Sequence, residues 1–562
     1  MNNDELKVDL LLLHAPAYFD FRKERKIYFP FMSTSGDVPI TPVYEFIPLG
    51  FKTLQEYIKQ DGHEVKILNL CSLMLQNPDM DLEECFKNIE AKIIGIDLHW
   101  MVHVQGALEI AAKLKKIHKD TFILFGGISS TYYAEELITY PFIDMVMRGY
   151  DTHMPMSQVV SEVKTHKNFQ SVPNLIWKNK KGEIIDNPVN HMPTKCSNGV
   201  NWSDIPQSNN SLIPMLDIVS TTNVGCANNC GWCGGSNKAF KRLYKDQNSP
   251  IFKDRIEINK EFESLKCIKD IKKYNFYSCG NYNQSDESFM EGLDQIEKYK
   301  FKSINYEQYS LQSKAMLKRM VHANSKTIIT LSPESHDIRI SKLSGRGNYS
   351  MEQMEIWIDD ALNIGIDEIN IWFFIGMPEQ DEKSVFETIK YCDHLLKRFK
   401  GSKVIPLICP LIPFLDPASN FFENSRQNGY KIFYRTVEEH RKGMMRASII
   451  NRLNYETKWL SREQIVKVGY KAIKELFMLK GEYNLISNSI VESLIDKLDD
   501  ALEFIDVVHK IDNIINEKDR NIELQDISED IYRRNQEVFF KGVLNQAFPV
   551  MRKHGQRWFD YV

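Results

Sequence analysis

The chain has 562 residues, more than a single hydrophobic core of about 250–300 residues accommodates, so two or three domains are expected. Hydrophobic residues make up 43% and charged residues 26% of the chain, a balance typical of folded proteins that excludes disordered and fibrous chains. The formal net charge of −4 gives no general attraction to phosphate backbones, which argues against a nucleic-acid partner.

No stretch of the sequence is suited to cross a membrane. The longest apolar runs, 369–377 and 407–415, fall short of the about 20 residues that a membrane-spanning helix needs. Acidic residues near the amino terminus stand where a signal peptide has a basic region. We therefore expect a cytoplasmic protein, whose ten cysteines are metal ligands, catalysts or spectators rather than disulfides.

Residues 8–150 alternate short apolar runs with segments of helical spacing. The expected strands are 8–13, 64–70, 92–97, 121–125 and 143–147. The expected helices are 49–60, 81–90, 104–117 and 133–139. Strands that are apolar on both faces and separated by helices predict an α/β domain of the doubly wound, Rossmann-like type over residues 1–155. Ligands of such a domain bind beyond the carboxyl ends of the strands.

Residues 156–210 are polar and contain turn signals, which favours a connector with a short hairpin. A second alternating series follows over residues 211–415. Its expected strands are 217–222, 275–279, 303–309, 327–331, 368–375 and 404–409. Its expected helices are 286–298, 313–322, 351–363 and 382–398. Six β/α units predict a partial barrel of the TIM type, because a complete one has eight.

Residues 416–562 are expected to form a mainly helical third domain, because strand signals fade beyond about residue 420. Ser461 and Gln464 have the spacing of a capping box that opens a helix, which Gly481 can close. Ser489 and Glu492 have the same spacing and are expected to open a longer helix.

Three of the ten cysteines lie in one loop, directly after the first strand of the second series. Cys226, Cys230 and Cys233 belong to the segment GCANNCGWCGG. This position is the mouth of the predicted barrel, where chemistry is expected. Three thiolates at this spacing can hold three irons of a [4Fe-4S] cluster and leave the fourth iron open, as a reactive cluster requires.

Two other interpretations of this loop are a structural zinc site and a redox-active cysteine pair. A structural zinc site needs four ligands, and because no histidine occurs between His191 and His322, the fourth would be Cys196 or another distant thiol. Redox chemistry would use Cys230 and Cys233 as a Cys-x-x-Cys pair, but it leaves Cys226 without a role. The iron–sulfur interpretation uses all three residues and is favoured.

The three cysteines, with Trp232 before the last of them, resemble the signature of the radical S-adenosylmethionine (SAM) enzymes. The resemblance extends over residues 216–411. Residues 333–337 and 343–347 are similar to the Glu-Ser-Gly stretch of that family and its downstream Lys-Gly. Residues 374–378 resemble its Gly-Leu-Pro turn, whereas residues 277–280 depart from the acidic turn that is common at the second strand.

This resemblance implies that the cysteines bind a [4Fe-4S] cluster whose open iron binds SAM. An electron from the cluster then cleaves SAM to a 5′-deoxyadenosyl radical. Trp232 is expected beside the adenine, and Glu334 at the ribose or the amino group of SAM. Residues expected to contact SAM are Trp232, Gly234, Glu334 and Ser335.

The front domain resembles the cobalamin-binding domain of cobalamin-dependent radical SAM enzymes. The residues that carry this resemblance, in order and spacing, are 48–50, 62–65, 126–127 and 134–136. Paired glycines at a strand end allow the backbone to approach a bulky ligand closely. Residues expected to contact cobalamin are His14, Pro16, Leu49, Gly50, Asp97, His99, Gly126, Gly127 and Gly149.

Asp97 and His99 are similar to the Asp-x-His-x-x-Gly motif that places a histidine on cobalt in other cobalamin domains. Val102 occupies the last position of the motif, and the pair follows the third predicted strand, where the axial histidine is not expected. We therefore expect His99 to line the corrin without being the conventional lower ligand. A hydrogen-bonded structural histidine is the alternative.

Cobalamin and SAM together imply, by resemblance, C-methylation of an unactivated carbon. One SAM methylates cobalamin, a second yields the radical that abstracts a substrate hydrogen, and the substrate radical takes the methyl group from methylcobalamin. The candidate substrate-side residues are Tyr306, Glu307, Tyr309 and Asp416.

The expected partners are a small-molecule, lipid or peptide substrate and an external electron donor such as flavodoxin or ferredoxin. Two alternatives stay open. One is a non-methylating enzyme that uses the same cofactors for cyclisation, ring contraction or oxidation, and the other is a cobalamin carrier or sensor without turnover.

Overall fold

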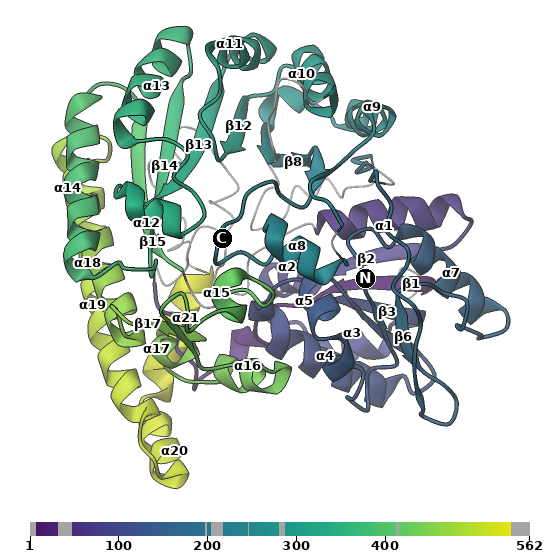
Figure 1. Ribbon diagram of the computed structural model, residues 1–562. Coiled ribbons are helices and arrows are strands. Elements are labelled where there is room, and N and C mark those ends of the chain that lie inside the picture. Colours follow the sequence, from purple (N-terminus) through teal and green to yellow (C-terminus); the bar gives the residue numbers. More distant parts are fainter. Residues whose placement is uncertain are drawn as a thin grey trace.

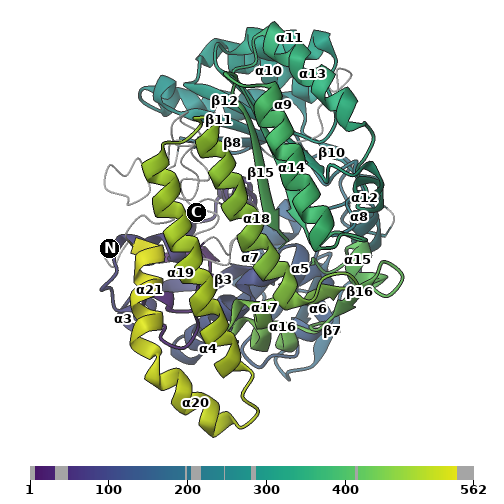
Figure 2. The ribbon, with the colours of Figure 1, turned by 90° about the vertical axis from the view of Figure 1, so that its left-hand side faces the viewer.

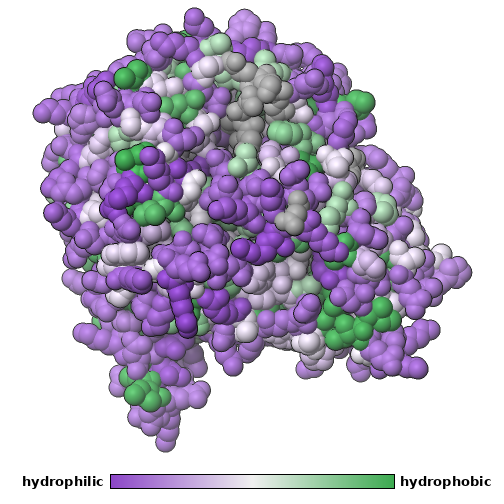
Figure 3. Space-filling model, in the orientation of Figure 1, coloured by the Kyte–Doolittle hydropathy of each residue, from purple (hydrophilic) through white to green (hydrophobic). Residues whose placement is uncertain are grey.

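The computed structural model describes residues 7–31, 48–196, 199–203, 217–245, 247–279, 287–411 and 415–540. Two sheets, each built mainly of parallel strands, lie one above the other in Figure 1. Long carboxyl-terminal helices run down one side of both. The face drawn in Figure 3 is mostly hydrophilic, with apolar residues in small separate groups. Among the described residues, no helix combines the length and the apolarity needed to span a bilayer.

The front sheet has the strand order β2-β1-β3-β4-β5-β6-β7. Its parallel strands are β1 (Lys7–His14), β2 (Val65–Asn69), β3 (Glu90–Asp97), β4 (Phe122–Gly126) and β5 (Met145–Met147). The strand order reverses between β1 and β3, which marks the position where such sheets bind ligands. The predicted doubly wound sheet is therefore confirmed.

Helices cover both faces of the front sheet. They are α1 (Leu49–Gln60), α2 (Leu70–Gln76), α3 (Leu82–Lys87), α4 (Val104–Ile117), α5 (Ile128–Tyr132), α6 (Ala134–Leu137) and α7 (His153–Lys164). The leucine run of β1 explains how they pack. Leu11 and Leu13 belong to one apolar cluster and Leu10 and Leu12 to another, because successive side chains of a strand point to opposite faces.

The predicted connector differs from expectation in one respect. Its hairpin, β6 (Leu175–Lys178) and β7 (Ile184–Asp186), pairs antiparallel and extends the front sheet beyond β5. Part of residues 156–210 therefore belongs to the front sheet. The other domain limits remain predictions.

The second sheet has six parallel strands in the order β15-β14-β13-β12-β11-β8. They are β8 (Asp217–Thr221), β11 (Asn275–Cys279), β12 (Ser303–Gln308), β13 (Thr327–Glu334), β14 (Glu368–Ile375) and β15 (Val404–Pro410). The helices of this part are α8 (Asn237–Leu243), α9 (Arg255–Ser264), α10 (Glu287–Tyr299), α11 (Lys314–Ala323), α12 (Ile338–Leu343), α13 (Met351–Ile364) and α14 (Glu382–Arg398). The short strands β9 (Asn223–Val224) and β10 (Ile251–Phe252) form a separate ladder. A partial six-stranded barrel is thus confirmed.

The last part of the chain is mainly helical, as predicted. Its helices are α15 (Asn420–Glu423), α16 (Val437–Met444), α17 (Ile449–Arg452), α18 (Arg462–Glu482), α19 (Asn488–Asp512), α20 (Glu517–Asp526) and α21 (Ser528–Phe540). An antiparallel pair, β16 (Tyr430–Ile432) and β17 (Tyr455–Thr457), was not expected. In Figure 2, α18 lies along α14 and β15 of the barrel, with which it is in contact.

The predicted helix ends in this part are only partly confirmed. Ser461 and Gln464 do form a capping box at the start of α18, in which each side chain accepts the backbone N–H of the other residue. Gly481 lies inside α18 rather than beyond it, and α19 begins after Ser487 rather than Ser489. Both of these sequence predictions were wrong.

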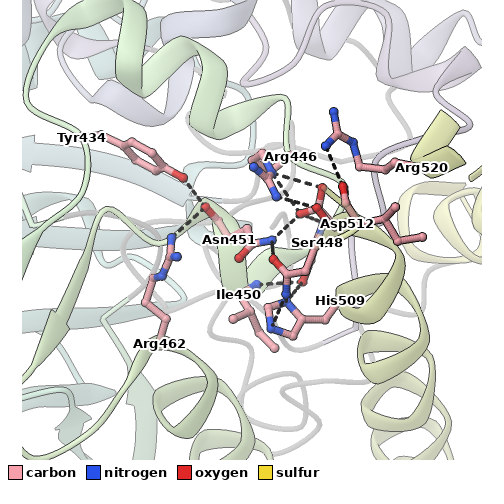
Figure 4. A network of polar contacts seen from close by, with 11 residues as sticks. Tyr434, Arg446, Ser448, Ile450, Asn451, Arg462, His509, Asp512 and Arg520 are labelled. Atoms are coloured by element: carbon pink, nitrogen blue, oxygen red, sulfur yellow. Dashed lines mark hydrogen bonds and ion pairs between the residues drawn. The ribbon is translucent and has the colours of Figure 1, made fainter. Parts of the chain in front are cut away.

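A buried carboxylate joins the end of α19 to α17 and to the segment before it (Figure 4). Asp512, 3% exposed, accepts hydrogen bonds from Asn451 Nδ2 at 2.6 Å, from Arg446 Nε at 3.1 Å and from the backbone N–H of Ser448 at 3.3 Å. These three donors are left without their acceptor when the carboxylate is removed.

We expect Asp512→Ala to lower the free energy of unfolding by about 3 kcal/mol, because breaking a buried hydrogen-bonded ion pair leaves its partners unsatisfied. Urea unfolding measures the change. Asp506→Ala is the matched control on the same helix, since Asp506 is an exposed partner of Lys467 whose loss is expected to lower stability by less than about 1 kcal/mol. Equal effects of the two substitutions would contradict the prediction.

Candidate functional site

The three-cysteine loop lies between β9 and α8, beyond the carboxyl end of β8. Backbone hydrogen bonds close it on itself and on α8. The N–H of Cys233 donates to the carbonyl of Cys230 at 3.3 Å, and the N–H of Asn237 donates to the carbonyl of Asn228 at 2.9 Å. Cys226, Cys230 and Cys233 are thereby held within a single compact turn at the barrel mouth.

The environment of the sulfurs disfavours free thiolates. Burial raises the pKa of Cys230 to about 12 and raises the pKa of Cys233 well above its usual value. Backbone N–H groups nevertheless point at two sulfurs, since Asn228 donates to Cys226 at 3.4 Å and Gly235 donates to Cys233 at 3.3 Å. Thiols with N–H donors aimed at them suit a soft metal centre, which replaces the thiol protons.

The side chains are not yet gathered around one centre. Within the described ranges, no three His, Cys, Asp or Glu side chains already surround a common metal position. Three thiols in one loop are nevertheless the kind and number of donors that a three-cysteine iron–sulfur cluster uses, so the donor set fits such a cluster.

Two other segments hold the loop from outside. The N–H of Gly231 donates to the carbonyl of Ser344 at 2.8 Å, and the N–H of Phe421 donates to the carbonyl of Gly231 at 2.7 Å. Asp416 accepts a hydrogen bond from the N–H of Gly234 at 2.9 Å. Asp416, expected on the substrate side, therefore contacts the residue after Cys233, and Gly234, expected at SAM, is fixed by that contact.

Glu334 and Trp232, both expected at SAM, lie in contact with each other. Glu334 is the last residue of β13, is fully buried and has a φ of 68°, a left-handed conformation that is strained for a glutamate. Trp232 Nε1 donates to Glu334 Oε1 at 3.2 Å, and Arg346 Nε donates to the same oxygen at 3.0 Å. Ser335, also buried, accepts the N–H of Asp337, the residue that caps the start of α12, at 3.1 Å.

Sequence reasoning missed Arg346. The signal was present, because Arg346 stands between Gly345 and Gly347 in the stretch compared with the Lys-Gly of radical SAM enzymes. Both glycines have positive φ angles, 91° and 72°. These two glycines allow the sharp backbone turn that carries Arg346, whose side chain is buried.

Two of the three predicted residues at the end of β12, Glu307 in the strand and Tyr309 just after it, join this group. Glu307 accepts hydrogen bonds from Tyr277 at 2.5 Å and from Tyr309 at 3.0 Å, and the guanidinium of Arg346 lies 3.9 Å from the centre of the Tyr309 ring. A continuous set of polar contacts thus runs from Tyr277 on β11 to Trp232 in the cysteine loop.

Tyr306 does not belong to this set. Its ring is fully buried and lies 6.3 Å from the ring of Phe289 on α10, so it faces the helices. Because side chains alternate along a strand, Tyr306 and Glu307 point to opposite faces of the sheet. The assignment of Tyr306 to the substrate side was an error of one residue in register.

Two histidines and a carboxylate meet at the carboxyl ends of β1 and β3. Nδ1 of His14 lies 2.8 Å and Nδ1 of His99 lies 2.9 Å from Oδ2 of Asp97. Burial opposes ionisation of Asp97, but these imidazoles hold the pKa of its carboxyl well below the usual range. His14 is buried, whereas the side chain of His99 is 24% exposed.

His103, which sequence reasoning passed over, adds a third ring to this group. Its ring centre lies 5.0 Å from that of His14, and its Nδ1 lies 2.9 Å from the carbonyl oxygen of Ala15. The sequence feature that could have pointed to His103 is its position four residues after His99, in an otherwise apolar segment.

The glycine pair after β4 has two different environments. Gly127 has a φ of 107°, and a Cβ atom there would lie 2.9 Å from the backbone nitrogen of His99. At Gly126, no atom lies within 4 Å of the Cβ position, and the same holds for Gly50 in the first turn of α1, next to Leu49. Gly127 is thus required for packing, and Gly126 keeps a strand end open.

The remaining predicted contacts lie at neighbouring strand ends. Gly149, after β5, has a φ of 137°, and its N–H donates to Thr131 Oγ1 at 3.2 Å. Pro16, after β1, packs against α4, because a Cβ at Gly106 would lie 1.9 Å from the carbonyl oxygen of Pro16.

The carboxyl end of the front sheet packs against the helix that follows the cysteine loop. Tyr150, after β5, has its ring centre 5.0 Å from that of Phe240 and 5.1 Å from that of Tyr244. Tyr132 on α5 donates a hydrogen bond to Glu423 at 2.7 Å. The ligand-binding edge of the front sheet and the mouth of the barrel therefore adjoin each other.

Comparison with known proteins identifies the front part of the chain. Residues 37–157 match the model of the B12 binding domain. This part of the chain is a B12 binding domain. The strand ends that carry Asp97, His99 and the glycine pair lie within the matched residues, and β1 with His14 precedes them in the same sheet.

The whole chain is similar to two solved structures. It has 14% sequence identity and a TM-score of 0.55 to the radical S-adenosylmethionine methyltransferase TsrM from Kitasatospora setae with tryptophan substrate and a SAM analogue bound, over 84% of this chain and 89% of that one. It has 13% identity and a TM-score of 0.53 to the cobalamin-dependent S-adenosylmethionine radical enzyme OxsB with aqua-cobalamin and SAM bound, over 98% of this chain and 80% of that one. No curated protein sequence matches the chain. The chain therefore has the same fold as TsrM and OxsB.

The residues of the B12 binding domain suit a large planar ligand at the β1–β3 edge. The open positions at Gly126 and Gly50 leave room for the ligand to approach the backbone, and the partly exposed His99 follows β3 at the same end of the sheet, next to Asp97. Cobalamin therefore fits the residues present, with His99 as the imidazole best placed to face it.

Proposed function

We propose that the protein is a cobalamin-dependent radical SAM enzyme that methylates an unactivated carbon of its substrate. The observation that carries the proposal is the contact of Tyr150, at the ligand edge of the B12 binding domain, with α8, which directly follows the three-cysteine loop. Two reagents must act on one substrate atom, so their sites have to adjoin. TsrM, a radical SAM methyltransferase of the same fold, supports the methyl-transfer outcome.

When bound, the [4Fe-4S] cluster supplies the electron that cleaves SAM, and cobalamin supplies the methyl group. The chain contributes binding and orientation. Cys226, Cys230 and Cys233 hold the cluster, while Glu334 and Trp232 form one side of the SAM site. On the substrate, one hydrogen atom bound to carbon is replaced by one methyl group.

Glu307 and Tyr309 are the residues that we assign to substrate orientation. The carboxylate of Glu307 is fixed by two tyrosine hydroxyls, which leaves two of its about four acceptor sites for a substrate donor. Its hydrogen-bonded position on β12 limits side-chain motion, so a bound substrate keeps the same carbon between the two reagents. The substrate is a small molecule, a lipid or a peptide, and identification of the methylated product decides among these classes.

His99 is proposed to line the corrin without being the conventional lower ligand of cobalt. Its Nδ1 is occupied by Asp97, and its side chain is partly exposed at the switch point of the sheet. Electron paramagnetic resonance of the cob(II)alamin form tests this assignment. A nitrogen superhyperfine splitting that disappears in His99→Ala would contradict it.

The proposed function is tested by anaerobic purification and reconstitution with iron, sulfide and cobalamin, followed by incubation with SAM and a strong reductant. We expect bound iron and corrinoid and formation of 5′-deoxyadenosine. Comparative metabolite mass spectrometry with and without the enzyme, in cytoplasm-derived extracts supplied with flavodoxin or ferredoxin, is expected to reveal a product heavier by one CH₂ unit. Turnover without that unit indicates cyclisation, ring contraction or oxidation, and absence of 5′-deoxyadenosine indicates a carrier or sensor.

Gly126→Val tests the cobalamin edge separately. Because no atom lies within 4 Å of the Cβ position, the larger side chain should leave the thermal unfolding midpoint unchanged, yet it occupies the space that we assign to cobalamin. We expect at least a tenfold weaker affinity for cobalamin, measured by absorbance titration. Gly127→Ala serves as the contrast, since its Cβ meets the His99 backbone and should lower stability as well. Unaltered cobalamin affinity in Gly126→Val would remove Gly126 from the site.

A further inference from the structure

A buried guanidinium lies beside the three-cysteine loop. The side chain of Arg346 is 7% exposed. It leaves the backbone next to Gly345, where a Cβ atom would lie 2.0 Å from the carbonyl oxygen of Asn229 and 3.0 Å from the backbone nitrogen of Cys230. The backbone that carries Arg346 is therefore in direct contact with the loop.

Part of the guanidinium is engaged by the protein and part is not. Nε donates to Glu334 Oε1 at 3.0 Å, and the charged group covers the ring of Tyr309 at 3.9 Å. Nη1 is buried and has no hydrogen-bond partner within the residues that the structure describes. A buried donor without an acceptor lowers stability by about 1–3 kcal/mol. Such a donor is expected where a bound group supplies the acceptor.

Arg346 and Glu334 carry opposite charges near Cys230, and they affect its pKa to different extents. Apart from burial, Arg346 has the largest influence on the pKa of Cys230 and lowers it, whereas Glu334 has a smaller influence and raises it. Arg346 also interacts with Cys226. Arg346 thus places a positive charge close to two of the three cysteines, and its burial keeps water from screening that charge.

We propose that Arg346 is a positioning residue whose fixed positive charge sets the reduction potential of the [4Fe-4S] cluster held by the three cysteines. Reduction adds one electron to the cluster from an external reductant, breaks no bond and makes the cluster more negative by one charge. A nearby cation stabilises the product of this step more than its reactant, so it raises the potential. The inference rests on the proposed function, because it requires that the loop bind a cluster.

The test is a redox titration of the reconstituted protein without SAM, with dithionite or titanium(III) citrate as reductant and electron paramagnetic resonance as the readout. We expect Arg346→Met to lower the equilibrium constant for reduction at least tenfold, equivalent to about 59 mV for one electron. Arg346→Lys should retain most of the wild-type potential. Arg339→Met is the matched control, because Arg339 is an exposed cation on α12 that pairs with Asp337.

A second variant gives the opposite sign. Glu334→Gln removes the opposing negative charge while keeping the side-chain size, so its potential should rise above that of the wild type. This variant decides the question if Arg346→Met takes up no iron. Equal potentials in the wild type, Arg346→Met and Glu334→Gln would overturn the inference, as would a shift that appears only after SAM is added.

These results separate the inference from the function on which it depends. A wild-type protein that retains no iron after anaerobic reconstitution refutes the proposed function. A wild-type protein that holds a cluster whose potential ignores the charges at residues 346 and 334 refutes only the role of Arg346.

Discussion

Replacing Cys230 with serine is expected to remove the cluster and to lower 5′-deoxyadenosine formation by at least a thousandfold. Cys230 is the middle ligand of the loop and is 5% exposed, so no water or outside ligand can take its place easily. The serine hydroxyl is a hard, protonated group that iron–sulfur centres do not favour. Iron content, the charge-transfer absorbance of the anaerobic protein and a SAM cleavage assay measure the loss.

Cys267→Ser is the matched control for this substitution. Cys267 is an exposed free thiol outside the cysteine loop, so its replacement should leave iron content and SAM cleavage unchanged. A Cys230→Ser protein with full iron content would show that the thiol is not a ligand. Parallel losses in both variants would point to general sensitivity of the protein to thiol replacement.

The strands were predictable because a strand that is buried on both faces appears in the sequence as a continuous apolar run. A run such as Leu10–Leu13 has no polar face to offer to solvent, and the structure divides these leucines between two apolar clusters. Helix ends were less predictable. The Ser489–Glu492 spacing imitates a capping box, but tertiary packing starts α19 after Ser487, and Gly481 is accommodated inside α18 against Val491.

The candidate site was predictable where its residues are close in sequence or belong to recognisable motifs. The three cysteines and the two separate motifs that carry Trp232 and Glu334 are of this kind, and the structure places Trp232 Nε1 at 3.2 Å from Glu334 Oε1. The surroundings of Tyr306 and Asp416 could not be predicted, for a physical reason. A residue's side of a strand depends on register, and the partner of a loop carboxylate depends on how distant segments fold together, neither of which a single motif encodes.

Gly345 is the position where the fold and the site depend on each other most directly. Its φ is 91°, and a Cβ atom there would lie 2.0 Å from the carbonyl oxygen of Asn229, a separation that van der Waals repulsion forbids. Gly345→Ala must therefore push the backbone before Arg346 away from the cysteine loop. We expect at least a tenfold loss of iron after reconstitution, measured together with the yield of folded protein.

Gly182→Ala isolates the effect of backbone strain from that of the clash. Gly182 has a φ of 80°, similar to that of Gly345, but no atom lies within 4 Å of its Cβ position in the β6–β7 turn. Alanine at either position pays the left-handed penalty of roughly 1–2 kcal/mol. Only at Gly345 does it also displace a cysteine-bearing backbone, so iron uptake should fall in Gly345→Ala and stay unchanged in Gly182→Ala. Full iron uptake by Gly345→Ala would mean that the loop holds its cluster without support from the turn that carries Arg346.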